Sequence, residues 1–562
     1  MAHISSQQLL AVVATGLVRY VRPSSLAGHQ LFKRYETFSI PAHLTFLFAP
    51  PLFAAVLLTS RAPQLSDILA LIAVYISTVA IATLAYRLSP FHPLAKYPGP
   101  AWCKISKFWM ACISYTGQQH TYLKYLHDRY GDIIRTGPND VSIRDPAALH
   151  AIFGSTGLPH GPMFVGRLLT VKDMPLVGIM DTEEHLRRRK PWACAFNGTA
   201  LKEYEPLVAK RAHQLVQALE RQKGEVDIGN WANYFSYDFM CDMAYGGGSE
   251  LLGDGNTNGF WRLLEAGLPI GTFLSHVPWL ALYLARIPGA TLSVQRVLAH
   301  SEDLTKKRLQ NGSRHKDLFH YLNHEDQPDI PPPPMKQVVS EGIIAVVAGS
   351  DTVSSALTSI FFCVTANPQV YKRLQDEIDR FYPPAQDSCD TQYHREMHYL
   401  TAVINESLRI YPPVPGGSQR QVPRDSNGAM LGSYFLPAGT AALLHTYSLQ
   451  RDPRSFSPHP ESFWPERWLL ASGRISFAEA GIADKALFAH NENAFLPFSY
   501  GPMNCVGKNL ALLEIRAVVI SVLQKFRLEL RAGWNTERYE EGFKDQFVTT
   551  RPAVPVTLTP RF

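Results

Sequence analysis

The sequence predicts a mainly α-helical fold with a minor β-sheet, preceded by an N-terminal membrane anchor. Helical periodicity of apolar residues dominates the chain after residue 95. Strand-like runs are few and short. Two long segments without charged residues lie within the first hundred residues, where they separate an anchor from a large C-terminal domain.

The N-terminal anchor is predicted to comprise residues 1–94, with transmembrane candidates at residues 40–60 and 68–86. At about 1.5 Å per residue these candidates span about 31 and 28 Å, close to the thickness of the hydrocarbon layer. Buried core helices and a cleaved signal peptide are the alternatives, but a signal peptide begins nearer to the N-terminus. Pro50–Pro51 weakens the first candidate, because proline kinks a helix. The apolar stretch 9–18 is too short to span alone and is predicted to lie at the membrane interface.

Basic residues on both outer flanks of this pair predict that the large domain faces the cytosol. The only charged residues in the connection between the two candidates are Arg61 and Asp67. The flanking cations are Arg19, Arg22, Lys33 and Arg34 before the pair and Arg87, Lys96, Lys104 and Lys107 after it.

Residues 95–562 are predicted to form the second domain, beginning near the stiff turn Tyr97-Pro-Gly-Pro. Helices are predicted at residues 121–130, 199–223, 336–366, 368–381 and 399–410. Strands are predicted at residues 133–135, 141–143, 434–436, 441–445 and 554–558.

The composition excludes an intrinsically disordered chain and does not support nucleic-acid binding. Of the 562 residues, 46% are hydrophobic, 11% aromatic and only 18% charged, which indicates that part of the surface faces lipid. The net charge of +6 is small and dispersed, and suits an anionic membrane or an acidic protein partner. The seven cysteines form no CxxC pair, as is typical of a reducing compartment.

The most informative motif surrounds Cys505. It reads Phe498-Ser-Tyr-Gly501-Pro-Met-Asn-Cys505-Val-Gly507, and a helix is predicted to begin just beyond the cysteine. The glycines allow a tight turn against a flat ligand, and the helix amides favour a thiolate. A thiolate so placed can be an axial ligand of haem iron. The alternative is a buried, inert cysteine beside a glycine-rich turn.

A second motif combines one carboxylate with two arginines. Glu406 and Arg409 are three positions apart on a predicted helix and can form an ion pair, although this spacing is common by chance. Arg467 follows in the aromatic, proline-containing segment 463–468 and can join the carboxylate in a buried network. Such a network fixes positions more than it stabilises.

A third motif, Ala348-Gly-Ser-Asp351-Thr352, lies in the middle of the long predicted helix. Gly349 costs about 1 kcal/mol there relative to alanine. Thr352 can bond a carbonyl one turn back and open the helix locally. The resulting groove, with an acid and a hydroxyl beside it, can hold oxygen and relay protons. The alternative is an ordinary helix with a surface Asp-Thr pair.

A fourth, basic motif covers residues 181–192 and contains His185 and Arg189. A basic cluster at a helix start is usually a solvated face. Its alternative is the pairing of these cations with propionate carboxylates.

With these four motifs in this order, the sequence resembles the cytochrome P450 monooxygenases over about residues 95–562. The anchor and Tyr97-Pro-Gly-Pro resemble the membrane-bound eukaryotic class. The motif around Cys505 is similar to that of enzymes from filamentous fungi, particularly basidiomycetes. The resemblance implies the cytochrome P450 fold, an α-rich prism that encloses haem b (iron protoporphyrin IX), and an endoplasmic reticulum membrane location.

The resemblance also implies roles for individual residues. Cys505 corresponds to the axial ligand of the haem iron, and Asp351 and Thr352 correspond to the acid–alcohol pair that activates oxygen. The remaining correspondences are haem-binding positions at His185, Arg189, Arg420, Phe498, Gly501 and Gly507, and a structural triad at Glu406, Arg409 and Arg467.

Met503 departs from the family pattern, which usually has an arginine two residues before the cysteine. The change removes one charge-assisted contact to a propionate, worth about 1.5–3 kcal/mol. Haem retention is therefore expected to depend on Arg189, on Arg420, and on Arg187 or Arg188.

The resemblance implies a monooxygenase that uses O2 and electrons from NADPH. A separate cytochrome P450 reductase, with cytochrome b5 as a further donor, is expected to supply the electrons, because no fused flavin or nicotinamide motif is visible. A haem-thiolate isomerase or dehydratase and a non-catalytic haem sensor are the alternatives, and the Asp351–Thr352 pair argues against both.

The substrate is predicted to be lipophilic. A mostly apolar pocket is expected from residues 161–180, 261–284, 344–348, 414–417 and 547–549. A terpenoid, sterol or other secondary metabolite is favoured, with a xenobiotic or a fatty acid as the alternative.

Overall fold

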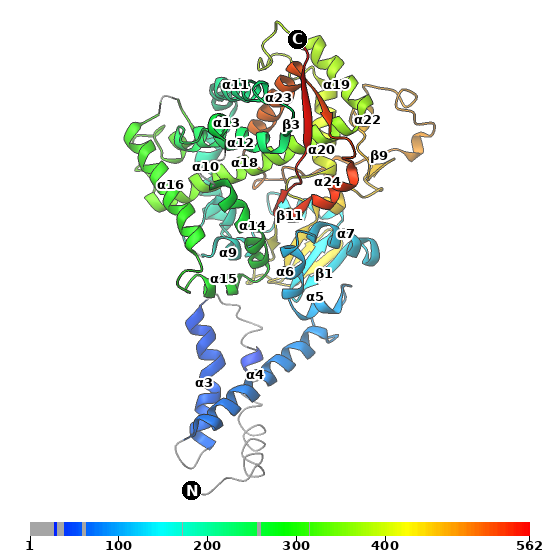
Figure 1. The fold of residues 1–562 in the computed structure, drawn as a ribbon. Coiled ribbons are helices and arrows are strands. Elements are labelled where there is room, and N and C mark those ends of the chain that lie inside the picture. The colour runs from blue at the N-terminus through cyan, green and yellow to red at the C-terminus, as the bar shows by residue number, and fades with distance from the viewer. Residues whose placement is uncertain (1–26, 31–38, 59–62, 171, 256–259, 314) are drawn as a thin grey trace.

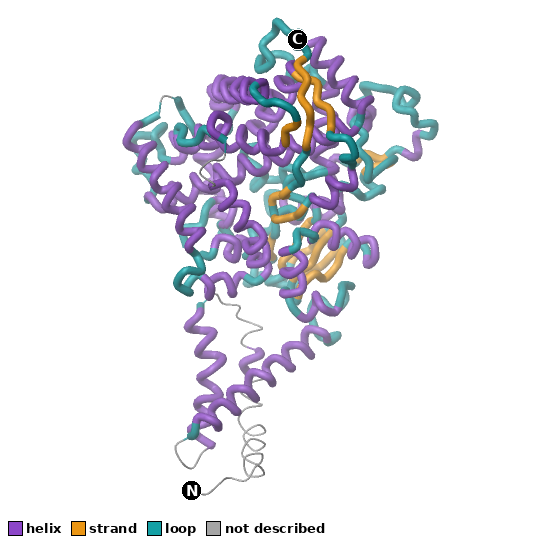
Figure 2. The backbone as a smooth tube through the Cα atoms, in the orientation of Figure 1, coloured by secondary structure: helices purple, strands orange, loops and turns teal. Residues whose placement is uncertain are grey.

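The computed structural model describes residues 27–30, 39–58, 63–170, 172–255, 260–313 and 315–562. It has a broad helical domain from which a pair of helices projects, with the strands gathered on one side of the domain (Figure 1, Figure 2). The predicted fold class, mainly helical with a minor sheet behind an N-terminal anchor, is confirmed. The predicted interfacial stretch 9–18 lies outside the described residues.

The helices follow the apolar periodicity closely, and α19 coincides with the predicted residues 368–381. Their bounds are α3 (Ile40–Leu58), α4 (Leu65–Leu88), α5 (Ala101–Ile105), α6 (Phe108–Tyr115), α7 (Gln119–Tyr130), α8 (Leu149–Phe153), α9 (Met163–Leu168), α10 (Thr182–Ala195), α11 (Gly198–Glu220), α12 (Ile228–Tyr245), α13 (Leu251–Asp254), α14 (Phe260–His276), α15 (Pro278–Leu284), α16 (Leu292–Asn311), α17 (Leu318–Leu322), α18 (Met335–Ala366), α19 (Pro368–Phe381), α20 (His398–Ile410), α21 (Thr446–Leu449), α22 (Glu466–Ala471), α23 (Lys508–Lys525) and α24 (Thr536–Gly542).

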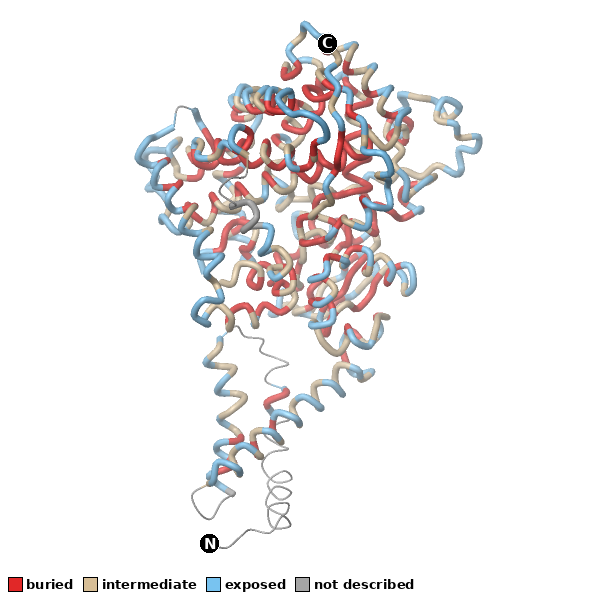
Figure 3. Tube along the Cα trace, in the orientation of Figure 1, coloured by how far each residue is buried: buried red, intermediate tan, exposed pale blue. Residues whose placement is uncertain are grey.

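The centre of the domain is the crossing of α18 with α12, where Figure 3 shows a concentration of buried residues. The two helices approach closely because α18 presents glycines to α12. A Cβ atom at Gly349 would lie 2.4 Å from Met240 Sδ, and one at Gly342 would lie 2.9 Å from the Tyr245 ring. Gly349 therefore serves helix packing, a role that the sequence did not predict.

The strands form one four-stranded sheet, one three-stranded sheet and three two-stranded pairs among the described residues. In the four-stranded sheet the order is β1-β2-β7-β4, with β2 and β7 parallel and the other neighbours antiparallel. Arg420 on β4 pairs with Ala442 on β7. The bounds are β1 (Ile133–Gly137), β2 (Asp140–Ile143), β3 (Glu225–Asp227), β4 (Arg420–Gln421), β5 (Ala429–Leu431), β6 (Tyr434–Leu436), β7 (Ala441–Leu444), β8 (Phe456–Ser457), β9 (Ala489–His490), β10 (Phe526–Leu530), β11 (Lys544–Gln546), β12 (Val548–Thr550) and β13 (Pro555–Pro560).

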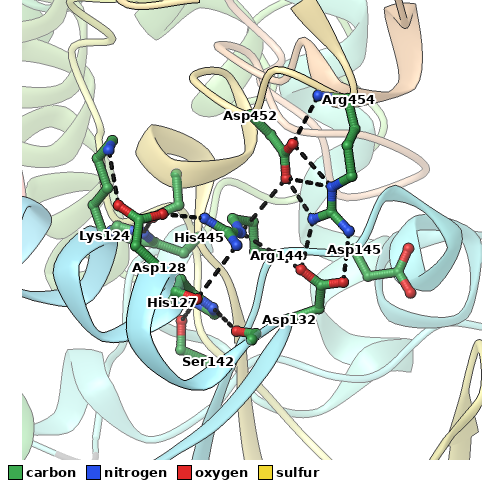
Figure 4. A network of polar contacts seen from close by, with 12 residues as sticks. Lys124, His127, Asp128, Asp132, Ser142, Arg144, Asp145, His445, Asp452 and Arg454 are labelled. Carbon is green, nitrogen blue, oxygen red and sulfur yellow. Dashed lines mark hydrogen bonds and ion pairs between the residues drawn. The ribbon is translucent and has the colours of Figure 1, made fainter.

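A polar network fastens α7 to the four-stranded sheet and to the loop after α21 (Figure 4). Arg144 contacts Asp128 on α7 and lies 3.5 Å from both Asp132 and Asp452. Arg454 bridges the same two carboxylates, with 2.6 Å from Nη2 to Asp132 Oδ1. Alternating charges in this network join segments that are more than 300 residues apart in the sequence.

The anchor consists of α3 and α4, which pack against each other through Ala55, Leu71 and Tyr75. Both are long and apolar enough to cross a membrane. Helix α3 runs through Pro50 and Pro51 without ending there. The helix α18 also meets the length and composition criteria, but 61% of it is buried, so it is a core helix.

Among the described residues, both α3 and the end of α4 contact the domain. At α3, His43 Nδ1 lies 3.0 Å from the Tyr283 hydroxyl on α15. At the end of α4, Arg87 donates to the Ile105 carbonyl at 2.6 Å. The aromatic patch beside these contacts consists of Phe108, Phe273, Trp279 and Tyr283, with 6.2 Å between the Phe108 and Trp279 ring centroids. Phe108 and Trp279 are both 41% exposed.

Deletion of residues 1–90 should release the protein from membranes only in part. The aromatic patch should retain interfacial affinity, because exposed aromatic side chains partition into the headgroup region. Flotation with phospholipid vesicles at low salt measures the bound fraction. Replacing Trp279 with serine in the truncated protein should lower that fraction, and complete solubility of the parent truncation would contradict a second contact.

Candidate active site

The Cys505 loop is a tight turn at the start of α23. The Cys505 N–H donates to the Phe498 carbonyl at 2.9 Å, which closes the loop. Gly501 has φ +74°, and a Cβ atom there would lie 1.8 Å from the Phe153 carbonyl oxygen, so only glycine fits. Gly507 directly precedes α23, with open space beside it as far as Phe196.

The electrostatics at the sulfur have two opposing parts. Burial raises the pKa of the Cys505 thiol, whereas the N–H groups of Gly507 and Lys508 and the Arg189 cation lower it. The side chain is deep within the protein but remains accessible. An accessible sulfur at a helix start, facing N–H groups and a guanidinium, has the surroundings of a metal-ligating thiolate.

A cluster of cationic and imidazole groups lies beside this loop without a carboxylate among the described residues. Arg420 is 1% exposed, stacks over the Phe153 ring at 5.1 Å, and has an unpartnered Nε. His185 is 2% exposed and has an unpartnered Nδ1. His160 pairs with Arg420 through a backbone bridge, and its ring meets that of His185 edge to face at 4.9 Å.

Burial and the neighbouring arginines lower the pKa of His160 to about 3 and that of His185 to about 4, so both rings are neutral. Burial also lowers the pKa of Arg420 to about 10, which leaves it a cation at neutral pH. A buried guanidinium with free donors and no counter-charge fits an anionic ligand, and the two propionates of haem satisfy that requirement.

The other arginines predicted for the propionates have partners within the protein. Arg189 donates to the Asn504 carbonyl at 2.9 Å and to Asn504 Oδ1 at 2.8 Å, so it holds the residue before the cysteine. Arg187 pairs with Glu184, and Arg188 pairs with Glu341 on α18. Met503 takes the place that the family's arginine would have, with Sδ 2.6 Å from Arg420 Nη1.

Asp351 and Thr352 lie half-buried on α18, and the helix is continuous through both residues. The Thr352 hydroxyl donates to the Ala348 carbonyl at 2.7 Å, as the sequence predicted, but the predicted local opening of the helix is absent. Burial raises the pKa of Asp351 to about 7, a trend that Arg551 and Arg167 oppose. A carboxyl with this pKa can both accept and release a proton at neutral pH.

Glu406 is fully buried and accepts hydrogen bonds from four residues. Arg409 approaches at 2.7 Å and Arg467 at 3.0 Å, and all three side chains are 0% exposed. The Trp464 N–H and the Trp468 indole N–H add bonds of 2.9 and 3.0 Å. The structure thus brings the three residues of the predicted triad together.

A cavity extends between the helices α6, α9 and α14 and the strands β2 and β7. Four of the five segments predicted for the pocket contribute to its lining, through Met163, Arg167, Thr272, Ser275, His276, Gly416, Gly417 and Phe547. The fifth segment, residues 344–348, does not line it. The exposed wall of this cavity is mostly apolar, as expected, although Lys107, Gln119, Asp140, Gln419 and Asp545 also line it.

Two residues of the site were missed in the sequence. His160 lies in a loop with no motif around it, and Asp545 occupies a short strand near the C-terminus. Only the fold brings each of them to a cavity or to an arginine, so no local pattern could have identified them.

Comparisons with known proteins agree with this geometry. The family model described as Cytochrome P450 matches residues 96–557. The Cytochrome P450 monooxygenase FCK2 of Fusarium pseudograminearum is 32% identical, covering 86% of this chain and 84% of its own length. The Cytochrome P450 monooxygenase orf5 of Eupenicillium brefeldianum is 30% identical, over 87% of this chain and 95% of its own length. Tryprostatin B 6-hydroxylase of Aspergillus fumigatus is 28% identical, over 90% of this chain and 89% of its own length.

The chain therefore belongs to the cytochrome P450 family, as the resemblance predicted, and is a fungal-type monooxygenase. Members of this family carry haem with a cysteine thiolate ligand and use dioxygen to oxidise lipophilic molecules. The apolar helices α3 and α4 are compatible with membrane anchoring.

Replacing Glu406 with glutamine should lower the free energy of unfolding by about 3–5 kcal/mol, because two buried guanidinium groups lose their counter-charge. Urea unfolding of the detergent-solubilised protein measures the change. Glu461→Gln is the matched control, since Glu461 is 53% exposed and pairs with Lys124 and Arg451. That control should change stability by less than about 1 kcal/mol, and an equal effect of both variants would contradict the importance of the buried network.

Met503→Arg should slow haem loss while destabilising the haem-free protein. The new guanidinium would lie beside Arg420, where only an anionic group can compensate two cations. The rate of haem transfer to apomyoglobin and the thermal midpoint of the haem-free protein measure the two effects. Met430→Arg is the control, because Met430 is 57% exposed on β5. Faster haem loss from Met503→Arg would instead indicate a pocket repacked around methionine.

Proposed function

We propose that this protein hydroxylates a lipophilic secondary metabolite, such as a terpenoid or sterol, with electrons from NADPH delivered by a separate cytochrome P450 reductase. The proposal places it in the endoplasmic reticulum membrane with its large domain in the cytosol. The observation that carries the reaction type is the Asp351–Thr352 pair on α18, in which a carboxyl with a pKa near 7 adjoins a hydroxyl. A relative named Tryprostatin B 6-hydroxylase supports hydroxylation as the outcome.

When bound, haem supplies the activation of dioxygen and the oxidation of a C–H bond. Cys505 would hold the iron, and the N–H groups of Gly507 and Lys508 would keep its sulfur in the thiolate form. Arg420 and His185 would bind the propionates through donors that have no other partner. Arg189 fixes the Cys505 loop by its two bonds to Asn504.

Proton delivery is assigned to Asp351 and Thr352. The Asp351 carboxyl exchanges its proton readily near pH 7, since the charges of Arg551 and Arg167 limit the rise of its pKa on burial. The Thr352 hydroxyl donates to the Ala348 carbonyl, so its oxygen can still accept a hydrogen bond from a proton donor. An isomerase or dehydratase that rearranges a peroxide needs no external protons, which favours the monooxygenase over that alternative.

An acidic electron donor is supported by exposed lysines near the cysteine loop. Lys190 on α10, Lys202 on α11 and Lys508 at the start of α23 are all exposed. Arg189 links α10 to the residue before Cys505, so this face adjoins the loop that would hold the iron. A cationic surface there would steer an acidic flavoprotein or cytochrome b5 toward the site.

Cys505→Ala should abolish the thiolate-specific absorption of the reduced, CO-bound protein and all NADPH-dependent product formation. The assay uses membranes that contain a fungal reductase and a library of terpenoids, sterols, aromatic xenobiotics and fatty acids. Cys194→Ala is the matched control on α10 and should retain both signals. A remaining thiolate band in Cys505→Ala would overturn the ligand assignment, and turnover without NADPH would favour the isomerase or dehydratase. Product only from fatty acids or xenobiotics would overturn the substrate class.

Asp351→Asn should raise the thermal midpoint more at pH 8 than at pH 4.5, and should release more peroxide per NADPH consumed. Between about pH 4 and 7 the unfolded carboxyl is ionised while the folded carboxyl keeps its proton, so Asp351 increasingly destabilises the fold as pH rises. Removal of the charge therefore helps most above pH 7. The exposed Asp425→Asn should behave alike at both pH values, and equal stabilisation by Asp351→Asn at both would contradict the raised pKa.

A further inference from the structure

Asp545 is a buried carboxylate in which only one of the two oxygens has a hydrogen-bond partner among the described residues. It lies on β11, is 3% exposed and lines the cavity described above. Its Oδ1 accepts the Phe547 N–H at 3.0 Å. Its Oδ2 is buried and has no partner among the residues that the structure describes. Leaving a buried acceptor unpaired is unfavourable, so this oxygen is a strong position for a ligand donor.

The surrounding backbone holds the carboxylate in this orientation. Phe547 follows with φ +78°, an uncommon conformation for a residue with a side chain, in the turn between β11 and β12. That turn directs the Phe547 N–H onto Oδ1 and leaves Oδ2 free. Gly416 faces the free oxygen, since a Cβ atom at this glycine would lie 3.7 Å from Oδ2. The absence of a side chain at Gly416 therefore keeps the approach to Oδ2 open.

No cation of the cavity neutralises Asp545 directly. Arg167 is the nearest candidate, but its Nη1 donates to Thr272 Oγ1 at 3.0 Å and its Nη2 to the Gln546 carbonyl at 2.7 Å. The Arg167 charge still reaches Asp545, and together with the Phe547 N–H it limits the rise of the carboxyl pKa on burial to about 6. Asp545 is therefore mainly ionised at neutral pH.

The second carboxylate of the same cavity provides a contrast. Asp140 Oδ1 receives the Lys107 ammonium at 2.8 Å and the Gln419 amide at 3.3 Å. Asp140 thus has a cationic partner within the protein, whereas Asp545 has none among the described residues. The two carboxylates line one cavity but differ in their partners. Asp140 therefore has a structural role, and Asp545 is the candidate for binding a ligand.

We propose that Asp545 Oδ2 accepts a hydrogen bond from an N–H or O–H group of the substrate. This inference rests on the proposed function, because it takes this cavity as the substrate cavity. The hydrogen bond narrows the substrate class to lipophilic molecules that carry a hydrogen-bond donor. A site built to receive a donor rejects an otherwise identical molecule that lacks it, because the acceptor is then left unpaired. Simple hydrocarbons and fully etherified molecules are therefore poor substrates.

The test uses 4-butylphenol and its methyl ether 4-butylanisole, which differ in the donor and by one methyl group. Binding to the full-length, haem-loaded protein in detergent is measured by equilibrium dialysis, with empty micelles as the blank. The phenol should bind at least about tenfold more tightly than the ether, since a hydrogen bond to a charged group is worth about 1.5–3 kcal/mol. Equal binding of the two compounds would overturn the proposal.

Asp545→Asn is the decisive variant. Asparagine keeps an oxygen for the Phe547 N–H, so the turn persists, but it places an amide donor where Oδ2 stood. In this variant the phenol and the ether should bind with about equal affinity. The affinity for the ether itself should change by less than about threefold. A preference retained in this variant would assign the donor to another acceptor and overturn the role of Asp545.

Two further variants separate the subsite from general damage to the cavity. Gly416→Ala should weaken phenol binding more than ether binding, because the new methyl group contacts Oδ2. Asp140→Asn should leave the preference unchanged, because Lys107 and Gln419 already occupy that carboxylate. Turnover of the unmodified protein with NADPH is measured separately. Normal turnover without a phenol preference in the unmodified protein rejects only the subsite, whereas a phenol preference without turnover rejects only the proposed reaction.

Discussion

The structure depends on the buried carboxylate of Glu406, which joins α20 to the segment that leads toward the cysteine loop. Arg409 and Arg467 both reach it, and Arg409 also donates to the Gln450 carbonyl at 2.8 Å. Burial of three charged side chains is unfavourable by itself, so the network gains its value from the positions it fixes. The pKa of Glu406 is lowered despite its burial because two guanidinium groups and the Trp464 N–H compensate its charge.

This constraint extends from the network to the ligand position. Gln450 donates through its amide to the carbonyls of Leu408 and Arg409, and its Oε1 accepts the Leu496 N–H at 2.9 Å. Leu496 is two residues before Phe498, whose carbonyl accepts the Cys505 N–H. Hydrogen bonds and a short stretch of chain therefore connect α20 to the backbone of Cys505. The buried triad therefore helps to position the cysteine loop.

The features that the sequence predicted well are those with local signals. Residues 368–381 and 434–436 were predicted to their ends, because periodicity and flanking turns define such elements. Cys505, Glu406 and Arg409 were found through glycine spacing and helix spacing. The partner of Arg188 was not predictable, since Glu341 comes from a helix about 150 residues away. For Gly349 the sequence predicted only a cost relative to alanine, whereas its contact with Met240 depends on a helix crossing that no local pattern encodes.

Partner choice distinguishes structural charges from ligand-binding charges in this protein. Arg188 with Glu341 and Lys107 with Asp140 have their counter-charges within the chain, and each pair ties two elements together. Arg420 and Asp545 are as deeply buried, yet each has a polar atom without a partner among the described residues. Because an unsatisfied buried group is unfavourable, such an atom beside a cavity or the cysteine loop is a candidate position for a ligand that pairs with it. Under the proposed assignments, the cation Arg420 would bind an anionic edge of the cofactor and the anion Asp545 would bind a donor group of the substrate.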